Sequence, residues 1–206
     1  DSIAGAAEMH RAGRRLGIAT TAGVELRVNA AGTALAGRMI NNPDSPGIMY
    51  VMLHGIPARR VDEVAAFLKP IQASRERRIA RMTGELTRLL PDVGLPELDF
   101  EHDVRSISRA DAGGTITERH LLFALSSRIL AAAGRGPRLP AWLRERLGLQ
   151  LPTRLAALLA EPMNPFLAYD LLGVLKSGFL GRVFIQPDGA ECVPVADVVR
   201  FGASVG

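Results

Sequence analysis

The sequence predicts a mostly parallel α/β fold. Two short runs, residues 22–28 and 48–54, are apolar and rich in β-branched side chains, as buried strands are. A long helical pattern covers residues 59–90, and shorter helical patterns follow it towards the C-terminus. Strands that alternate with helices favour parallel sheets, because the crossover helices cover the faces of the sheet. With 206 residues, the chain is long enough to bury a sizeable core.

The first part of the chain predicts one helix and several short strands. Ser2 can cap a helix that ends near Leu16, and Gly17 can end it in a left-handed turn. Residues 29–46 are rich in Gly, Asn and Pro, which predicts a loop with a short helical turn at 35–39. The strands are expected at residues 18–20, 24–28 and 48–54.

The long helical pattern at residues 59–90 has two faces. Pro70 is expected to kink or split this helix, because proline lacks the N–H that the helical hydrogen bond needs. The apolar stripe consists of Ile79, Met82, Leu86, Leu89 and Leu90. The opposite face carries Arg75, Arg77, Arg78 and Arg81. This basic face is interpreted as a solvated surface, with a phosphate-binding patch as the alternative.

The second half of the chain is predominantly helical in pattern. Thr117 is expected to cap a helix over residues 118–133, and the Gly- and Pro-rich residues 134–140 then break the pattern. Residues 183–186 predict a strand. Further helices are expected at residues 142–147, 152–160, 164–175 and 193–201.

Composition narrows the function classes. The formal net charge of +4 is modest and comes mostly from arginine, so nucleic-acid binding is not favoured, whereas a phosphorylated small-molecule substrate suits arginine well. Cys192 is the single cysteine, which excludes an internal disulfide and predicts a cytoplasmic protein. No membrane partner is expected, because charged residues and prolines interrupt the most apolar stretch, residues 155–175. Composition leaves the oligomeric state open.

Three side chains are candidates for chemistry. His54 ends an apolar strand, on the same side as Tyr50. Glu25 lies in an apolar strand, where a buried carboxylate requires either a metal ion or a nearby arginine. His120 is expected in the first turn of its helix, where the helix dipole keeps the imidazole neutral and able to bind metal. His102 is interpreted as a surface residue.

Several motifs resemble those of the PHP (polymerase and histidinol phosphatase) superfamily of metal-dependent phosphoesterases. The opening residues 1–5 are similar to those that follow the family's Thr-Asp-His element, and residues 17–25 resemble its Gly-Ile…Pro-Gly-x-Glu motif, with Ala22 in place of proline and Glu25 at the ligand position. The helix with Arg75, Arg78 and Met82 is similar to the family's arginine-containing helix. Residues 116–121 resemble its Arg-x-His-Ile-Ala element, with Glu118 at the arginine position and His120 at the ligand position.

The resemblance implies a fold and a ligand set. The implied fold is a distorted seven-stranded β/α (TIM-like) barrel, incomplete in this chain, with extra helices in the second half. Residues 1–133 would form part of the barrel, residues 134–178 a helical insertion, and residues 179–206 a return to the barrel. Glu25, His54 and His120 would bind divalent metal ions (Zn, Mn or Fe), with Tyr50 as the alternative to His54 at the strand position.

The implied activity is metal-dependent hydrolysis of phosphate esters. The family's His-x-His, Asp-His and late Asp-x-His motifs do not occur in the chain, so we expect it to be an internal part of a longer protein. The first alternative is a catalytically inactive binding or structural module, which the substitutions at Ala22, Tyr50 and Glu118 favour. The second alternative is a polymerase-associated nuclease, which would bind DNA with a strong dependence on salt.

Overall fold

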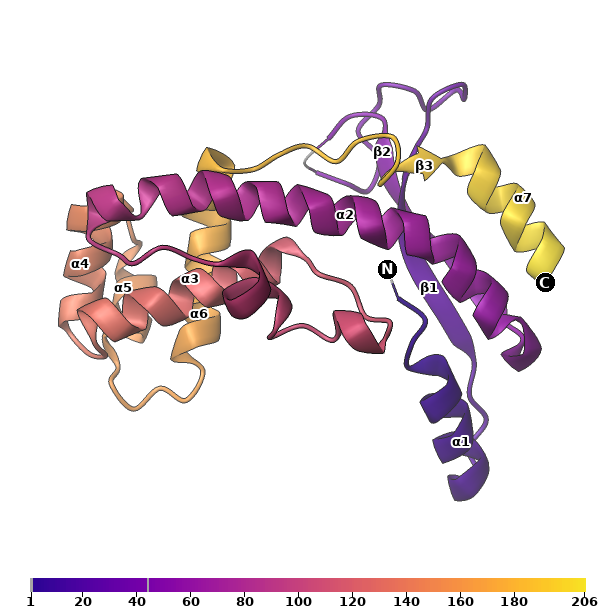
Figure 1. The fold of residues 1–206 in the computed structure, drawn as a ribbon, viewed down its shortest axis with the longest axis horizontal. Helices are drawn as coiled ribbons and strands as arrows, with labels where there is room; N and C mark the ends of the chain where they lie inside the picture. Colours follow the sequence, from indigo (N-terminus) through magenta and orange to yellow (C-terminus); the bar gives the residue numbers. More distant parts are fainter. Residues whose placement is uncertain (1, 44) are drawn as a thin grey trace. The chain divides into compact units, whose positions relative to one another are not determined.

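The computed structural model describes residues 2–43 and 45–206, and Figure 1 shows the order of the elements along the chain. Asp1, part of the opening motif, lies outside the described residues. The chain forms two compact units. Unit 1 consists of Asp1–Arg77, Arg109–Thr115 and Gln186–Gly206, and unit 2 consists of Arg78–Ser108 and Ile116–Ile185.

Unit 1 is built on a three-stranded sheet with the order β2-β1-β3. Strand β1 (Ala22–Asn29) pairs antiparallel with β2 (Ile48–Ile56) and parallel with β3 (Val193–Pro194). The predicted seven-stranded barrel and the mostly parallel sheet are therefore wrong for the described residues. The physical reason is the connection between β1 and β2. Its described residues contain turns and bends but no crossover helix, so β2 returns beside β1 in the opposite direction.

One face of this sheet is buried and the other is open to solvent. Along β1, Ala22, Val24, Leu26 and Val28 are buried, whereas the residues between them are exposed or half-buried. Helices α1 (Ala6–Leu16) and α7 (Val195–Val205) and the first part of α2 (Val61–Leu89) contribute side chains to the same core. Phe67 of α2 stacks on Phe201 of α7 with ring centroids 4.1 Å apart. Because side chains alternate along a strand, one face of the sheet packs against the helices and the other face is open to solvent.

The side chain of Asn41 takes the place of a neighbouring strand at the outer edge of β2. Its Nδ2 donates to the carbonyl oxygen of Tyr50, and the N–H of Tyr50 donates to its Oδ1, both at 2.9 Å. Asn41 belongs to the connection after β1. The helical turn predicted at residues 35–39 is wrong, because residues 35–37 form only a hydrogen-bonded turn and residues 38 and 39 have no regular structure.

The predicted end of the first helix is confirmed, but the predicted cap is wrong. Gly17 has φ 68° and adopts the left-handed conformation that ends α1. The N-cap is Gly5, and no side chain caps the helix there. Ser2 instead donates its hydroxyl to the carbonyl oxygen of Gly113 at 2.7 Å, which ties the two segments of unit 1 together.

Helix α2 (Val61–Leu89) runs through Pro70 without a break, so the predicted split at this residue is wrong. Its residues up to Arg77 belong to unit 1 and those from Arg78 onward belong to unit 2. The predicted apolar stripe is confirmed for Ile79, Met82, Leu86 and Leu90, which are at most 1% exposed, whereas Leu89 is 39% exposed.

Unit 2 is helical. Its helices are α3 (Glu118–Ala133), α4 (Arg138–Leu147), α5 (Thr153–Ala160) and α6 (Leu167–Gly178), preceded by a short π-helix, η3 (Phe100–Arg105). Helix α3 packs against α6, and Leu125 of α3 and Leu171 of α6 are fully buried. The strand predicted at residues 183–186 is wrong, because these residues form neither a strand nor a helix. Short 3₁₀ turns occur at Ala58–Arg60, Pro91–Val93, Ala110–Ala112 and Leu180–Arg182.

Within residues 2–43 and 45–206, none of the helices combines the length and the apolar character required to cross a membrane.

Candidate functional site

The solvent face of the sheet carries two of the predicted ligands. Gly23 pairs with His54 and Glu25 pairs with Met52, so Glu25 and His54 occupy diagonal positions on one face of the β1–β2 pair. Diagonal cross-strand positions are about 7–8 Å apart, which is within reach of long side chains. Both residues are exposed. The register therefore brings a carboxylate and an imidazole to the same patch of surface.

The expectation that Glu25 is a buried carboxylate is wrong. Its neighbours Val24 and Leu26 are 3% and 2% exposed, but the side chain of Glu25 points to the opposite, exposed face. The apolar run had suggested burial on both faces, whereas only alternate side chains of β1 are buried. Glu25 therefore does not need a cation to compensate for burial, and its case as a ligand depends on its position beside His54.

Gly23 has no side chain and so leaves room for the imidazole of His54, which lies opposite it on the neighbouring strand. A Cβ atom at Gly23 would lie 3.2 Å from Cδ2 of His54 and 2.9 Å from the carbonyl oxygen of Leu53. The second of these contacts is with backbone, which cannot move aside easily. Any larger residue at position 23 would therefore displace the histidine ring or the strand.

Arg27 adds a positive charge to the same face. It pairs directly with Tyr50, its Nη2 donates to the Tyr50 hydroxyl at 3.4 Å, and its guanidinium lies 5.7 Å from the centre of the Tyr50 ring. The Nη1 atom of Arg27 lies 3.6 Å from Oε1 of Glu191. Tyr50, the alternative to His54 as a predicted ligand, thus orients the guanidinium of Arg27.

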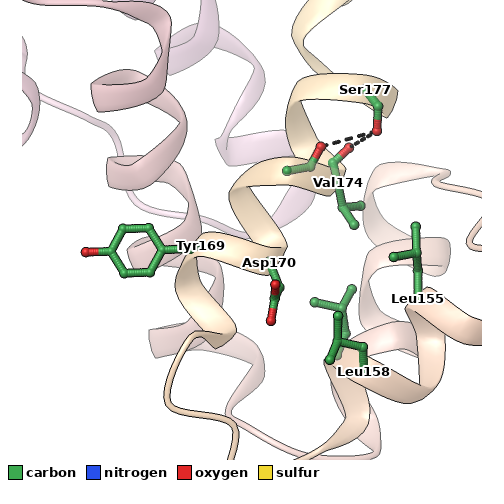
Figure 2. A pocket seen from close by; sticks show the side chains of 8 residues that line it. Leu155, Leu158, Tyr169, Asp170, Val174 and Ser177 are labelled. Carbon is green, nitrogen blue, oxygen red and sulfur yellow. Dashed lines mark hydrogen bonds between the residues drawn. The ribbon is translucent and has the colours of Figure 1, made fainter.

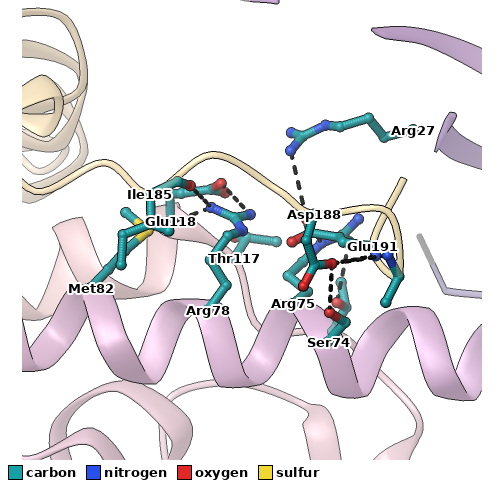
Figure 3. A network of polar contacts seen from close by, with 12 residues as sticks. Arg27, Ser74, Arg75, Arg78, Met82, Thr117, Glu118, Ile185, Asp188 and Glu191 are labelled. Carbon is teal, nitrogen blue, oxygen red and sulfur yellow. Dashed lines mark hydrogen bonds and ion pairs between the residues drawn. The ribbon is translucent and has the colours of Figure 1, made fainter. Parts of the chain in front are cut away.

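A buried ion pair lies next to Arg27 in unit 1 (Figure 3). Arg75 donates from Nε to Oε1 of Glu191 at 2.9 Å, and the two side chains are 3% and 1% exposed. Asp188 accepts hydrogen bonds from the N–H of Glu191 and from the Ser74 hydroxyl. The N–H of Glu191 is the main reason that the pKa of Asp188 lies below its usual value. The ion pair fixes the segment before β3 against α2.

A second arginine of α2 is buried within unit 2 (Figure 3). Arg78 donates to Oε1 of Glu118 at 2.7 Å and to the carbonyl oxygen of Ile185 at 3.2 Å, and its guanidinium lies 5.8 Å from the ring centre of Phe184. Arg75 and Arg78 are each 3% exposed, so the predicted solvated face is wrong at both positions. Glu118 is thus the partner of a buried arginine.

His120 belongs to unit 2, whereas Glu25 and His54 belong to unit 1. The predicted cap is confirmed, since Thr117 and His120 form a capping box at the start of α3. The N–H of Thr117 donates to Nδ1 of His120 at 3.0 Å, which requires a lone pair on that nitrogen. Burial lowers the pKa of His120 and favours the same neutral ring. Nδ1 is thus engaged in the helix cap, and Nε2 remains as the nitrogen that could bind an ion.

The lowered pKa of His120 predicts a pH dependence of stability. The unfolded chain binds a proton at this histidine near the ordinary pKa of 6.5, while the folded protein binds it only at lower pH. Stability therefore falls as the pH decreases through 6.5, and the loss levels off below the folded-state pKa. Urea unfolding between pH 8 and 5 should show this loss in the wild type and a shallower one in His120→Asn. Parallel curves for the two proteins would contradict the assignment.

The described residues contain no group of three or more His, Cys, Asp or Glu side chains placed to hold a metal ion. Glu25 and His54 have side chains whose chemistry suits a metal ion, whereas a metal site in a protein generally needs at least three ligands. His102 is a surface residue, as predicted, with an 89% exposed side chain whose Nδ1 lies 3.0 Å from Asp99. The sheet face thus fits part of a metal site.

Comparison with known proteins adds no relative: no family model, curated protein or solved structure matches this chain.

Proposed function

We propose that the protein takes part in the metal-dependent hydrolysis of phosphate esters, with Glu25 and His54 as ligands on the open face of the sheet. The observation that carries this proposal is their diagonal placement on neighbouring strands. Carboxylate and imidazole together suit Zn, Mn or Fe. A bound ion of this kind supplies charge that stabilises the phosphate oxygens and lowers the pKa of water.

Arg27 supports a phosphorylated ligand at the same face. Arginine binds phosphate oxygens through two parallel donors, and Tyr50 holds this guanidinium on the face of the sheet that also carries the two proposed ligands. Since Glu191 also lies near Arg27, the arginine is oriented from two sides. We assign Arg27 the role of positioning a phosphate group, and the proposed ligand class is a phosphorylated small molecule.

Metal binding tests the proposal directly. We expect Glu25→Gln and His54→Gln each to weaken Zn²⁺ or Mn²⁺ binding by at least about tenfold, because even residues that only support a ligand contribute that much. The measurement is the metal content after equilibrium dialysis, together with hydrolysis of p-nitrophenyl phosphate. Both residues are exposed, so the variants should keep the circular dichroism spectrum of the wild type.

Matched controls separate this site from general charge effects. Glu97→Gln and His102→Gln remove the same chemical groups from exposed positions in unit 2 and should leave metal binding unchanged. Equal metal binding by wild type, Glu25→Gln and His54→Gln would refute the proposed ligands.

A binding module without catalysis is the second candidate function. It is favoured by the finding that the described residues provide no cluster of three metal-binding side chains. In that case phosphorylated compounds would bind at the sheet face through Arg27, and p-nitrophenyl phosphate would not be hydrolysed at any metal concentration. Binding of inorganic phosphate that is weakened in Arg27→Gln, without hydrolysis in the wild type, would establish this function instead.

A further inference from the structure

A groove of about 330 Å³ lies between helices α5 and α6, within unit 2 (Figure 2). Its walls are mainly aliphatic, with Leu155 and Leu158 from α5 and Val174 from α6. Leu155 is 37% exposed and Leu158 is 41% exposed, so both present apolar surface to a ligand. The volume is at the lower end of the range typical of sites for small molecules.

Asp170 introduces a negative charge into this apolar groove. Its Oδ2 accepts a hydrogen bond from Nδ2 of Asn164 at 2.7 Å. Asn164 is itself 8% exposed, and its Oδ1 accepts from the N–H of Phe166 at 2.9 Å. The carboxylate is therefore held in one orientation, and a ligand would not need to order it.

Ser177 and Tyr169 are the other polar side chains that line the groove, and the hydroxyl of Tyr169 points away from Asp170 (Figure 2). The hydroxyl proton of Ser177 is directed to backbone carbonyl oxygens, with Oγ 3.1 Å from the oxygen of Val174 and 3.3 Å from that of Gly173 (Figure 2). The remaining lone pairs of Oγ can only accept hydrogen bonds. Asp170 and Ser177 therefore favour a ligand that donates hydrogen bonds, and Asp170 favours one that is positively charged.

Gly173 leaves the space between Asp170 and Ser177 open. It lies on α6 between Asp170 and Ser177, which are two helical turns, or roughly 10 Å, apart. A Cβ atom at Gly173 would meet no other atom within 4 Å. The space above this glycine is therefore available to a bound chain rather than filled by the protein.

We propose that this groove binds a primary alkylammonium ion. The ammonium group would donate to Asp170, and the alkyl chain would lie over Gly173 against Leu155, Leu158 and Val174. An anion would be repelled by Asp170, and a neutral apolar molecule would cover the carboxylate without compensating its lost hydration. The groove belongs to unit 2 and the sheet face to unit 1, so the tests of the two proposals are independent of each other.

Titration with hexylamine, followed by NMR chemical shifts or calorimetry, tests the proposal. Hexylamine should bind saturably, while 1-hexanol and hexanoate should bind at least about tenfold more weakly, the difference expected for one charge-assisted hydrogen bond. Asp170→Asn should remove the preference for the amine. It keeps an oxygen that accepts from Asn164, so the loop before α6 should stay in place.

A second variant fills the groove. Gly173→Leu should abolish hexylamine binding without lowering the melting temperature, because the position has open space and leucine favours the helix over glycine. Asp92→Asn removes a carboxylate at an exposed position away from the groove and should bind hexylamine as the wild type does. Absence of saturable binding, equal affinity for hexylamine and 1-hexanol, or unchanged binding in Asp170→Asn would each overturn the proposal.

Discussion

Replacing Glu191 with alanine is expected to lower the free energy of unfolding by about 3–5 kcal/mol, the typical effect of breaking a buried ion pair. Glu191 is 0% exposed, and its carboxylate accepts from Arg75 at 2.9 Å. Without it, the buried guanidinium of Arg75 would lose the carboxylate that forms ion pairs with Arg75 and Arg27. Urea unfolding followed by circular dichroism measures the loss.

A double variant distinguishes the ion pair from simple packing. Arg75→Met combined with Glu191→Leu removes both charges and keeps apolar volume, so it should be more stable than Glu191→Ala. Glu97→Ala, at an exposed position, should change stability by less than about 0.5 kcal/mol. A loss below about 1 kcal/mol in Glu191→Ala would contradict the structural role given to this pair.

Leu125→Ala is expected to destabilise the protein by about 2–5 kcal/mol, as is usual when a large core side chain is truncated. Leu125 is 0% exposed on α3, and this helix packs against α6. The deletion would leave a cavity that rigid neighbouring helices cannot fill. The single tryptophan, Trp142, lies on α4 in the same unit, so its fluorescence reports the unfolding of unit 2.

An exposed leucine supplies the comparison for this variant. Leu89, near the end of α2, is 39% exposed, and Leu89→Ala should change stability by less than about 0.5 kcal/mol. Equal losses in Leu125→Ala and Leu89→Ala would show that Leu125 does not belong to a packed core.

Local sequence signals predicted most helices of the protein. Thr117 at the start of α3 and Gly17 at the end of α1 are capping residues whose effect depends only on neighbouring backbone. The apolar stripe of α2 was likewise visible from spacing. These signals depend only on residues close together in the sequence. They explain why α2 was predicted over its full length, although Pro70 suggested a break within it.

The pairing of the strands was not predictable in the same way. Strand β3 has two residues, too few for a periodic signal, and it pairs with Val28 and Asn29 of β1 from far along the chain. The direction of β2 depends on the connection before it, where composition suggested a loop but not its path. The barrel followed from resemblance alone, and the structure replaces it with an open three-stranded sheet.

The candidate site was predicted in part. The alternation of side chains correctly placed Tyr50 and His54 on one side of their strand, and the register adds Glu25 to that side. The partnership of Arg75 with Glu191 was missed, because the two residues are 116 positions apart and no local pattern connects them. The charged residue Glu191 within a short apolar segment was the one signal that could have indicated a buried partner.

The amide of Asn41 has a consequence for how protein molecules behave towards one another. An outermost strand with a free row of N–H and C=O groups can recruit the same strand from another molecule, and such pairing leads to aggregation. Asn41 occupies both groups of Tyr50 and interrupts this row on β2. A single side chain thereby opposes fibril-like association along the edge of the sheet.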